Sequence, residues 1–289
     1  MPDTVAQASA YLSHLAFESS QPERLADFYG DIMQMEVSQI SDDEWRCEGP
    51  ARRLVALRGK DKTLSYAGLA VRDADGLEMI RARAESEGIE ILDSPSPYFK
   101  EGAFGVRDYD GNLILFGLSK PAYVKTMGWP RPNHGQPIWG PTQHLTLRSR
   151  DMDGFVEFYH EKLGFRMVDR VLFENGDPAA IFITSNHEHH TIGVFKGTEN
   201  GVDHHSYEAG EWNYLRDWCE HFSSRGIKLV WGPGRHGAGH NLFAFIEDCD
   251  GAWIEISAEL EVIHDRPCEE WKAEGNSNTW GDQIVRKQS

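Results

Sequence analysis

The feature that most constrains this chain is an internal repeat. Residues 14–29, HLAFESSQPERLADFY, match residues 144–159, HLTLRSRDMDGFVEFY, at an offset of 130 residues. In each copy a short strand pattern precedes a helix pattern, whose apolar residues are spaced three and four apart along one face. A repeat of this kind indicates that the same unit folds at least twice. We therefore expect a chain of two similar halves.

Two further pairs of segments repeat. Residues 77–88 and 215–226 share a helix pattern, and each ends at a glycine suited to a left-handed C-cap. A strand is expected directly after each glycine, in GIEI and in GIKL. The segments RDYDGNLILFG and EDCDGAWIEIS also match, and in both an Asp-Gly turn joins two strands. Each half thus contains two βαβββ modules, which predicts an α+β fold of four modules.

The repeat also predicts the domain organisation. Its offset grows from 130 to 138 residues between the first and second helix pairs, so the second half carries an insertion between about Val168 and His205. Insertions into one copy of a repeat commonly mark function. We expect an N-terminal domain over residues 1–125 and a C-terminal domain over residues 140–262, joined by a proline-rich linker at 126–139. Residues 263–289 fall outside the repeat, and we expect this tail to be a lid over the site or a contact between subunits.

Charge and composition exclude several classes of protein. The chain has 29 basic and 46 acidic residues and a formal net charge of −17, which disfavours nucleic acid and anionic membranes as partners. We expect no membrane span, since no apolar run reaches about 18 residues, and a cytoplasmic location, since the N-terminus lacks a signal-peptide pattern. The 13 histidines are concentrated in the second half, which suggests a metal or proton-transfer site.

Three strand positions of the second half carry residues that can bind a metal: His144, His205 and Glu255. A carboxylate among apolar strand residues is costly to bury unless it is paired or bound to a metal. Two histidines and one carboxylate are the ligands of non-heme ferrous oxygenases, and catalytic zinc accepts the same set. The alternative is that the three residues are unrelated. The repeat argues against this alternative. We align the three residues with His14, Tyr66 and Leu115 of the first half, so only the second half has ligand residues at all three places.

With these residues, the sequence resembles the vicinal oxygen chelate superfamily over residues 10–262, and within it the type I extradiol dioxygenases. The resemblance implies two similar barrel-like domains, of which the C-terminal one is catalytic. It implies that the metal ligands are His144, His205 of VDHHSYEA and Glu255, and that His204 is structural or supports a ligand. The implied cofactor is Fe(II), with Mn(II) possible. The implied reactants are a catechol-like aromatic diol and dioxygen, and the implied assembly is a homo-oligomer.

Two further motifs support this resemblance, and one position departs from it. HHTIGVF implies that His190 is the catalytic acid and base, with a solvated loop histidine as the alternative, and GPGRHG implies that His236 contacts the substrate oxygen. We expect His189 and His240 to border the substrate as well. The family usually has a tyrosine where this chain has Phe245, which keeps the ring and loses the hydroxyl donor.

Two other functions remain open at this stage. Phe245 favours another metal enzyme of the superfamily, an isomerase or a hydrolase, in which the ion acts as a Lewis acid. The same fold also serves proteins that sequester small molecules, and such a protein would need no metal ligands.

Overall fold

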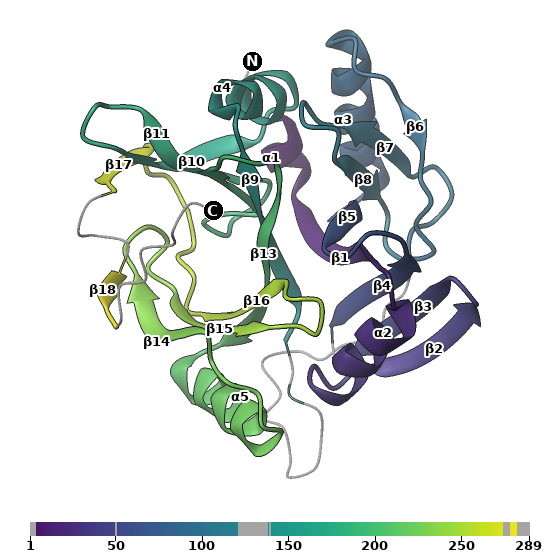
Figure 1. Ribbon diagram of the computed structural model, residues 1–289. Coiled ribbons are helices and arrows are strands. Elements are labelled where there is room, and N and C mark those ends of the chain that lie inside the picture. Colours follow the sequence, from purple (N-terminus) through teal and green to yellow (C-terminus); the bar gives the residue numbers. More distant parts are fainter. Residues whose placement is uncertain (1–3, 50, 121–137, 139, 274–277, 282–289) are drawn as a thin grey trace.

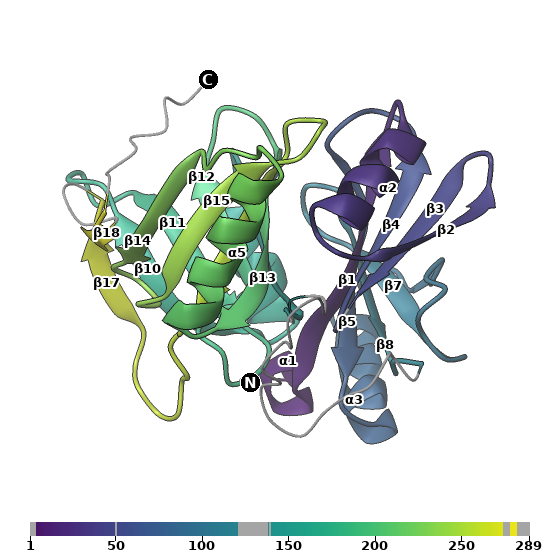
Figure 2. The ribbon, with the colours of Figure 1, turned by 90° about the horizontal axis from the view of Figure 1, so that it is seen from below.

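The computed structural model of the chain describes residues 4–49, 51–120, 138, 140–273 and 278–281. Its strands form two sheets, one from each half of the sequence, that lie side by side (Figure 1 and Figure 2). The predicted linker, residues 126–139, lies outside the described residues apart from Ile138.

The first half contains a short helix and two modules. The helix is α1 (Thr4–Ala8). The first module consists of β1 (Ala10–Ser19), α2 (Pro22–Asp31), β2 (Glu36–Ser41), β3 (Glu44–Gly49) and β4 (Arg52–Arg58). The second consists of β5 (Thr63–Val71), α3 (Ala74–Ser86), β6 (Leu92–Asp93), β7 (Phe104–Arg107) and β8 (Leu113–Gly117).

The second half repeats this order and adds two strands from the tail. Its first module consists of β9 (Thr142–Ser149), α4 (Met152–Phe155), the π-helix η1 (Val156–Lys162), β10 (Arg166–Leu172), β11 (Pro178–Thr184) and β12 (Ile192–Lys196). Its second consists of β13 (Gly201–Gly210), α5 (Trp212–Ser224), β14 (Trp231–His236), β15 (Leu242–Glu247) and β16 (Trp253–Ala258). The tail strands are β17 (Glu269–Lys272) and β18 (Asn278–Trp280).

The strand orders of the two sheets correspond. The first sheet runs β2-β3-β4-β1-β5-β8-β7-β6, and the second runs β17-β10-β11-β12-β9-β13-β16-β15-β14-β18. In each, the two modules meet where their first strands pair antiparallel, β1 with β5 and β9 with β13. The predicted fold of four βαβββ modules is therefore confirmed. The tail strands extend both edges of the second sheet, where β17 pairs with β10 and β18 with β14 (Figure 1).

The predicted helix ends are confirmed, and the strand starts after them differ from prediction. Gly88 and Gly226 have φ of +71° and +72°, the left-handed conformation that glycine adopts without steric cost. The chain after each glycine is not paired at once: β6 begins only at Leu92 and β14 only at Trp231. Ile89 and Ile227 instead donate their backbone N–H back to the last helical turn, to the carbonyls of Ala84 and Phe222.

The predicted insertion lies in two loops of the second half. β11 ends at Thr184 and β12 begins at Ile192, whereas β3 ends at Gly49 and β4 begins at Arg52. The β10–β11 connection is also longer than its counterpart between β2 and β3. The loop between β11 and β12 carries His189 and His190, so the insertion adds chemistry that the first half lacks.

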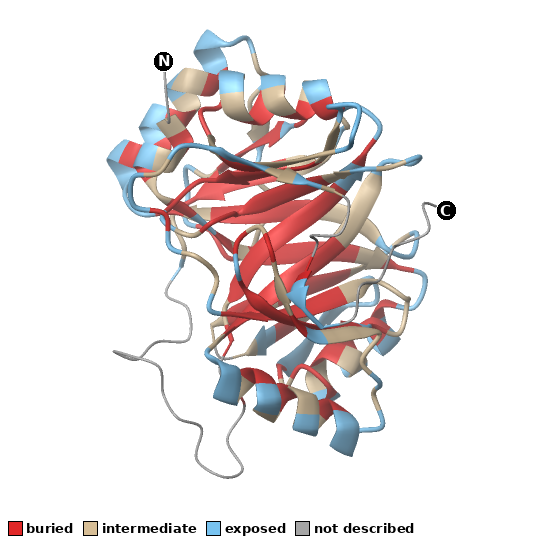
Figure 3. Ribbon diagram, turned by 90° about the vertical axis from the view of Figure 1, so that its left-hand side faces the viewer, coloured by how far each residue is buried: buried red, intermediate tan, exposed pale blue. Residues whose placement is uncertain are grey.

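The two halves share buried surface. Most strands are largely buried and the helices expose their outer faces, as Figure 3 shows, whereas the edge strand β2 is exposed. One hydrophobic core cluster contains residues of both halves, among them Leu15 and Leu145. The hydroxyl of Tyr159 donates to Oδ2 of Asp108 across the boundary at 2.7 Å. Among the described residues, no helix is long and apolar enough to cross a membrane.

Candidate active site

Three adjacent strands of the second sheet bring a group of potential metal ligands together. His144 comes from β9, His204 from β13 and Glu255 from β16. One ligand atom of each lies within 4.8 Å of the others, and all three side chains are buried. Nε2 of His144 is 2.8 Å from Oε2 of Glu255, and Nε2 of His204 is 3.5 Å from the same oxygen.

The second histidine of this group is His204, and the prediction of His205 at this place is wrong. Successive side chains of a strand point to opposite faces, so two adjacent histidines cannot both face the group. His205 faces the first half, where Nε2 is hydrogen-bonded to the hydroxyl of Tyr29 at 3.0 Å. Its ring also lies 5.1 Å from that of Phe17, measured between centroids.

A signal in the sequence could have found His204. The second helix pair repeats at an offset of 138, and the same offset aligns Tyr66 with His204. The strand register agrees, because Ala16 pairs with Tyr66 and the equivalent Thr146 pairs with His204. The alignment of Tyr66 with His205 was thus shifted by one residue.

The donor atoms of the group fit a divalent metal. Nε2 of His144 is buried and makes no hydrogen bond, although Glu255 lies beside it. Its Nδ1 lies 3.3 Å from Oε1 of Gln143, whose amide nitrogen donates to Glu208, so Oε1 is the acceptor and Nδ1 carries the proton. His144 therefore directs an unprotonated Nε2 at the group while its Nδ1 is bonded to oxygen, the arrangement usual for a histidine that binds a metal.

The second histidine and the carboxylate are held in the same way. Nδ1 of His204 donates to Oδ1 of Asp203 at 2.6 Å. Oε1 of Glu255 accepts a hydrogen bond from Nδ2 of Asn241 at 3.0 Å. Burial would raise the pKa of Glu255, but the neighbouring His144 and His204 hold that pKa well below its usual range. The carboxylate is therefore ionised, as a metal ligand must be.

Two more histidines flank the group. The ring of His190 lies 4.1 Å from that of His144, between centroids, and burial together with the charges possible on His144 and His189 lowers the pKa of His190 well below its usual value. Nε2 of His236, on β14, lies 3.6 Å from Oε1 of Glu255. The structure thus brings both residues to the group as the sequence suggested, while their roles stay predictions.

The remaining predicted pocket residues lie at different distances from the group. Phe245 faces Glu255 across the β15–β16 pair, and its ring lies 5.2 Å from that of His204. His189 lies behind His190, bonded to its Nδ1 at 3.0 Å. His240 is exposed and contacts Trp271 of the tail, so the structure does not place it in the group.

Several supporting residues were not predicted. Asn241 bonds Glu255, Asn278 of β18 bonds Nδ1 of His236 at 3.0 Å, and Asp169 of β10 bonds His189. Asn278 and Asp169 belong to no repeated motif and lie far along the chain from the residues they contact. No pattern in a single sequence identifies such contacts.

The equivalent place in the first half is filled by side chains. His14 is buried between the hydroxyls of Ser13 and Ser96, and burial lowers its pKa to about 3. Aromatic rings surround His14 with their edges or faces: Tyr66, Tyr98 and Phe99. Within the described part of the chain, the second half alone holds a group of His, Cys, Asp or Glu suited to a metal.

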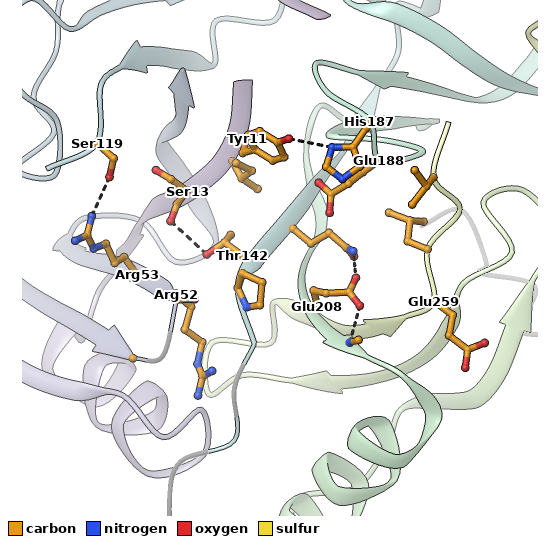
Figure 4. Close-up of a pocket in the computed structure, with 18 of the residues that line it drawn as sticks. Tyr11, Ser13, Arg52, Arg53, Ser119, Thr142, His187, Glu188, Glu208 and Glu259 are labelled. Carbon is orange, nitrogen blue, oxygen red and sulfur yellow. Dashed lines mark hydrogen bonds between the residues drawn. The ribbon is translucent and has the colours of Figure 1, made fainter. Parts of the chain in front are cut away.

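A cavity of about 560 Å³ lies beside this site, between the two halves. Figure 4 shows Tyr11, Arg52 and Arg53 on the first half, and Glu188 and Glu208 on the second. Burial raises the pKa of Glu188 to about 7 and that of Glu208 to about 8. Gln143 borders the cavity and links Glu208 to His144 of the metal group.

Comparisons with known proteins agree with this architecture. Metapyrocatechase 2 of Cupriavidus necator is 24% identical over 245 residues, which are 78% of this chain and 74% of the relative. The substrate complex of homoprotocatechuate 2,3-dioxygenase from Brevibacterium fuscum superposes with a TM-score of 0.79 at 20% identity, covering 96% of this chain and 92% of that one. A Mn(II)-bound glyoxalase from Novosphingobium aromaticivorans superposes with a TM-score of 0.76 at 20% identity, covering 94% and 91%.

The family model of the Glyoxalase/Bleomycin resistance protein/Dioxygenase superfamily matches residues 11–116 and 142–256, which are the two sheets without the tail. The two matches repeat the division that the sequence and the strand order show. This chain therefore belongs to the Glyoxalase/Bleomycin resistance protein/Dioxygenase superfamily.

Proposed function

We propose that this protein is an extradiol dioxygenase, which cleaves the ring of a catechol-like diol beside its hydroxyls and inserts both atoms of dioxygen. The observation that carries the proposal is the group of His144, His204 and Glu255 with two further histidines at its border. A relative with 24% identity is named metapyrocatechase, and a structural neighbour is an extradiol enzyme in complex with an aromatic diol, 3,4-dihydroxyphenylacetate.

The proposed cofactor is Fe(II), held by His144, His204 and Glu255. The ion would lower the pKa of a diol hydroxyl and hold the reactants together, which makes their meeting effectively intramolecular. A Mn(II)-bound structural neighbour makes manganese the second candidate.

His190 is the proposed proton acceptor and donor. It is buried, its ring packs against His144, and burial keeps it neutral, so one ring nitrogen is available to take a proton from the diol. Phe182 packs against His190, with ring centroids 5.0 Å apart.

His236 is the proposed hydrogen-bonding partner of a substrate oxygen. Its ring stacks on Phe243 at 3.9 Å and its Nδ1 bonds Asn278, which fixes the ring plane and leaves Nε2 toward the group. A neutral His236 then accepts from a substrate hydroxyl, and a protonated one donates to a substrate oxygen.

An aromatic wall on the same side supports an aromatic substrate. Phe245 stacks on Trp231, with ring centroids 5.1 Å apart, and Trp253 lies 5.6 Å from Phe245. Flat apolar surfaces next to a few polar groups are typical of sites for small aromatic ligands.

Oxygen uptake tests the proposal. The metal-free chain is loaded anaerobically with Fe(II), Mn(II) or Zn(II) in parallel and offered catechol, 3-methylcatechol and 3,4-dihydroxyphenylacetate. We expect one dioxygen consumed per diol, with a yellow ring-opened product, in the Fe(II) or Mn(II) sample and none in the Zn(II) sample. Glu255→Ala, treated in the same way, is the matched control and should consume none.

A second candidate function is an isomerase or hydrolase that uses the metal as a Lewis acid. Phe245 favours it, because the hydroxyl donor usual in extradiol enzymes is absent from this position. Full metal occupancy without oxygen uptake on any of the diols would contradict the dioxygenase and favour this candidate. Failure to retain any of the three metals would instead favour a sequestering protein.

A further inference from the structure

We propose that Asp169 is a positioning residue, which acts through His189 to decide which ring nitrogen of His190 carries the proton. This inference rests on the proposed function, because His190 is the proton-transfer residue of that reaction. Asp169 itself lies one histidine away from His190 and touches neither the metal group nor the cavity beside it.

The three residues form a continuous hydrogen-bonded chain. Nδ1 of His190 lies 3.0 Å from Nδ1 of His189, and Nε2 of His189 lies 2.9 Å from Oδ2 of Asp169. Asp169 and His189 are fully buried, and His190 is 5% exposed. Since β10 supplies Asp169 and the inserted loop supplies both histidines, the chain joins two separate elements.

A contact between two imidazole nitrogens allows only one proton between them. If both Nδ1 atoms carried a proton they would repel each other, and if neither did, two buried acceptors would lack a donor. One of the two histidines must therefore donate to the other. The pair alone does not determine which.

Asp169 decides the direction. Its carboxylate can only accept, so Nε2 of His189 carries a proton and donates to it. A neutral His189 then has an unprotonated Nδ1, which accepts from His190. His190 therefore carries its proton on Nδ1, and its Nε2 is left as the free lone pair with which it can take a proton from substrate.

The charge of Asp169 is held in place by two other donors. Nε1 of Trp271 donates to Oδ2 at 2.8 Å, and the guanidinium of Arg266 donates to Oδ1 at 2.9 Å. Both donors come from the segment that follows the repeat. Arg266 is a positively charged partner of Asp169. The buried carboxylate is therefore paired with a charge even when His189 is neutral.

The position of the proton on His190 can be measured directly. The full-length protein, labelled with ¹⁵N in its histidines and loaded with diamagnetic Zn(II), is examined by long-range ¹H–¹⁵N NMR, with His190→Gln used to assign the signals. We expect His190 to be protonated on Nδ1 and His189 on Nε2. Protonation of His190 on Nε2 would overturn the inference, whether or not the protein cleaves diols.

Kinetics supply the second test. Asp169→Leu removes the acceptor and places an apolar side chain there, and His189→Phe keeps an aromatic ring and removes both nitrogens. We expect each to lower kcat about 10- to 100-fold, with metal content and KM within about twofold of wild type. The double variant should be no slower than the slower single variant, because both changes break the same chain.

The matched control is Glu261→Gln. Glu261 is the other carboxylate that pairs with Arg266, and both of its oxygens accept hydrogen bonds from that guanidinium. Its replacement should leave kcat unchanged. An unchanged kcat in Asp169→Leu, or fully additive losses in the double variant, would contradict the inference. A wild-type protein that consumes no dioxygen would contradict the proposed function alone, since the NMR result still decides the proton position.

Discussion

At the scale of residues, His204 and His205 are neighbours on β13 with different surroundings. His204 faces Glu255, whereas His205 bonds Tyr29 of the first half. Successive side chains of a strand point to opposite faces of the sheet. Moving by one residue along β13 therefore leads from the face with the metal group to the face at the boundary between the halves. Two adjacent histidines thus belong to two separate places, the proposed metal site and the boundary between the halves.

This difference makes the first prediction. His204→Ala should lose the metal, because one of three ligands is removed, while His205→Ala should retain it and lower the free energy of unfolding by about 1–3 kcal/mol, since the hydroxyl of Tyr29 loses its buried partner. Metal content after dialysis and urea denaturation measure the two effects. Metal retained by His204→Ala and lost by His205→Ala would reverse the assignment.

The second prediction concerns the departure at Phe245. Phe245→Tyr adds one hydroxyl beside His204 and His236, whose rings lie 5.2 Å and 6.3 Å from that of Phe245. A hydrogen bond to a charged substrate oxygen is worth about 1.5–3 kcal/mol, so kcat/KM for simple catechols should rise about tenfold or more. Phe243→Tyr, two residues away on β15 and paired with Ser257, is the control. No gain from Phe245→Tyr would show that another group already supplies this contact.

The third prediction concerns Glu208 and pH. Burial raises the pKa of Glu208 from 4.5 to about 8, so between these values the folded protein binds a proton that the unfolded chain does not. The resulting stability is complete below about pH 4.5 and is lost as pH rises through about 8. The side chain of Glu208→Gln cannot titrate. Between these pH values its free energy of unfolding should therefore fall less steeply than that of wild type, by up to about 1.4 kcal/mol per pH unit.

Urea denaturation of both proteins at several pH values measures this difference. Glu259→Gln is the control, because Glu259 borders the same cavity, is exposed and is paired with Arg235. Equal slopes for wild type and Glu208→Gln would show that Glu208 is ionised in the folded protein.

At the scale of elements, two additions distinguish the second half from the first half. The longer β11–β12 loop supplies His189 and His190, and the tail adds β17 and β18 to the edges of the sheet. The tail also contacts residues around the metal group. Asn278 bonds His236, and Trp271 bonds Asp169, the partner of His189. The tail is therefore part of the site's surroundings in this structure, and its role as a lid or as a subunit contact stays a prediction.

The fourth prediction belongs to β18. Asn278→Ala removes the partner of Nδ1 of His236, so the ring is less well fixed while the metal ligands are untouched. We expect kcat to fall roughly two- to tenfold, the effect of one hydrogen bond, with metal content unchanged. Thr279→Ala, on the same strand, is the control, since the Thr279 hydroxyl bonds only the backbone of Arg235. Equal losses in both variants would indicate a general weakening of β18.

At the scale of the whole molecule, the two halves are similar in fold and different in content. The first half fills the equivalent place with His14 and aromatic rings, whereas the second holds His144, His204 and Glu255 there. Their boundary is also buried, with one core cluster and the Tyr29–His205 and Tyr159–Asp108 hydrogen bonds across it. The first half thus supports the second without duplicating its chemistry.

The fifth prediction follows from this shared core. Wild type should unfold in urea in one transition, with the same midpoint by far-UV circular dichroism and by tryptophan fluorescence, because neither half can lose its structure without exposing the boundary. Tyr159→Phe should lower the free energy of unfolding by about 1–3 kcal/mol and leave a single transition, since Asp108 loses a buried donor. Two separate midpoints in wild type would show that the halves fold independently.

The sequence alone was sufficient for the modules, the place of the insertion and the strands that carry the metal group. These depend on spacing along the chain, and the match between the two halves makes each spacing visible twice. His144 and Glu255 could be predicted for this reason. The helix ends at Gly88 and Gly226 could be predicted as well, because a left-handed residue is a local requirement.

Only the tertiary structure decided the choice between His204 and His205, because the face of a strand residue depends on its register with the neighbouring strands. The same holds for Asp169 and Asn278, whose hydrogen bonds join residues from distant parts of the sequence. The filled site of the first half was also invisible, since Tyr98 and Phe99 reach His14 only after the second module folds against the first. Local patterns determine which elements form, and packing between elements determines which side chains meet.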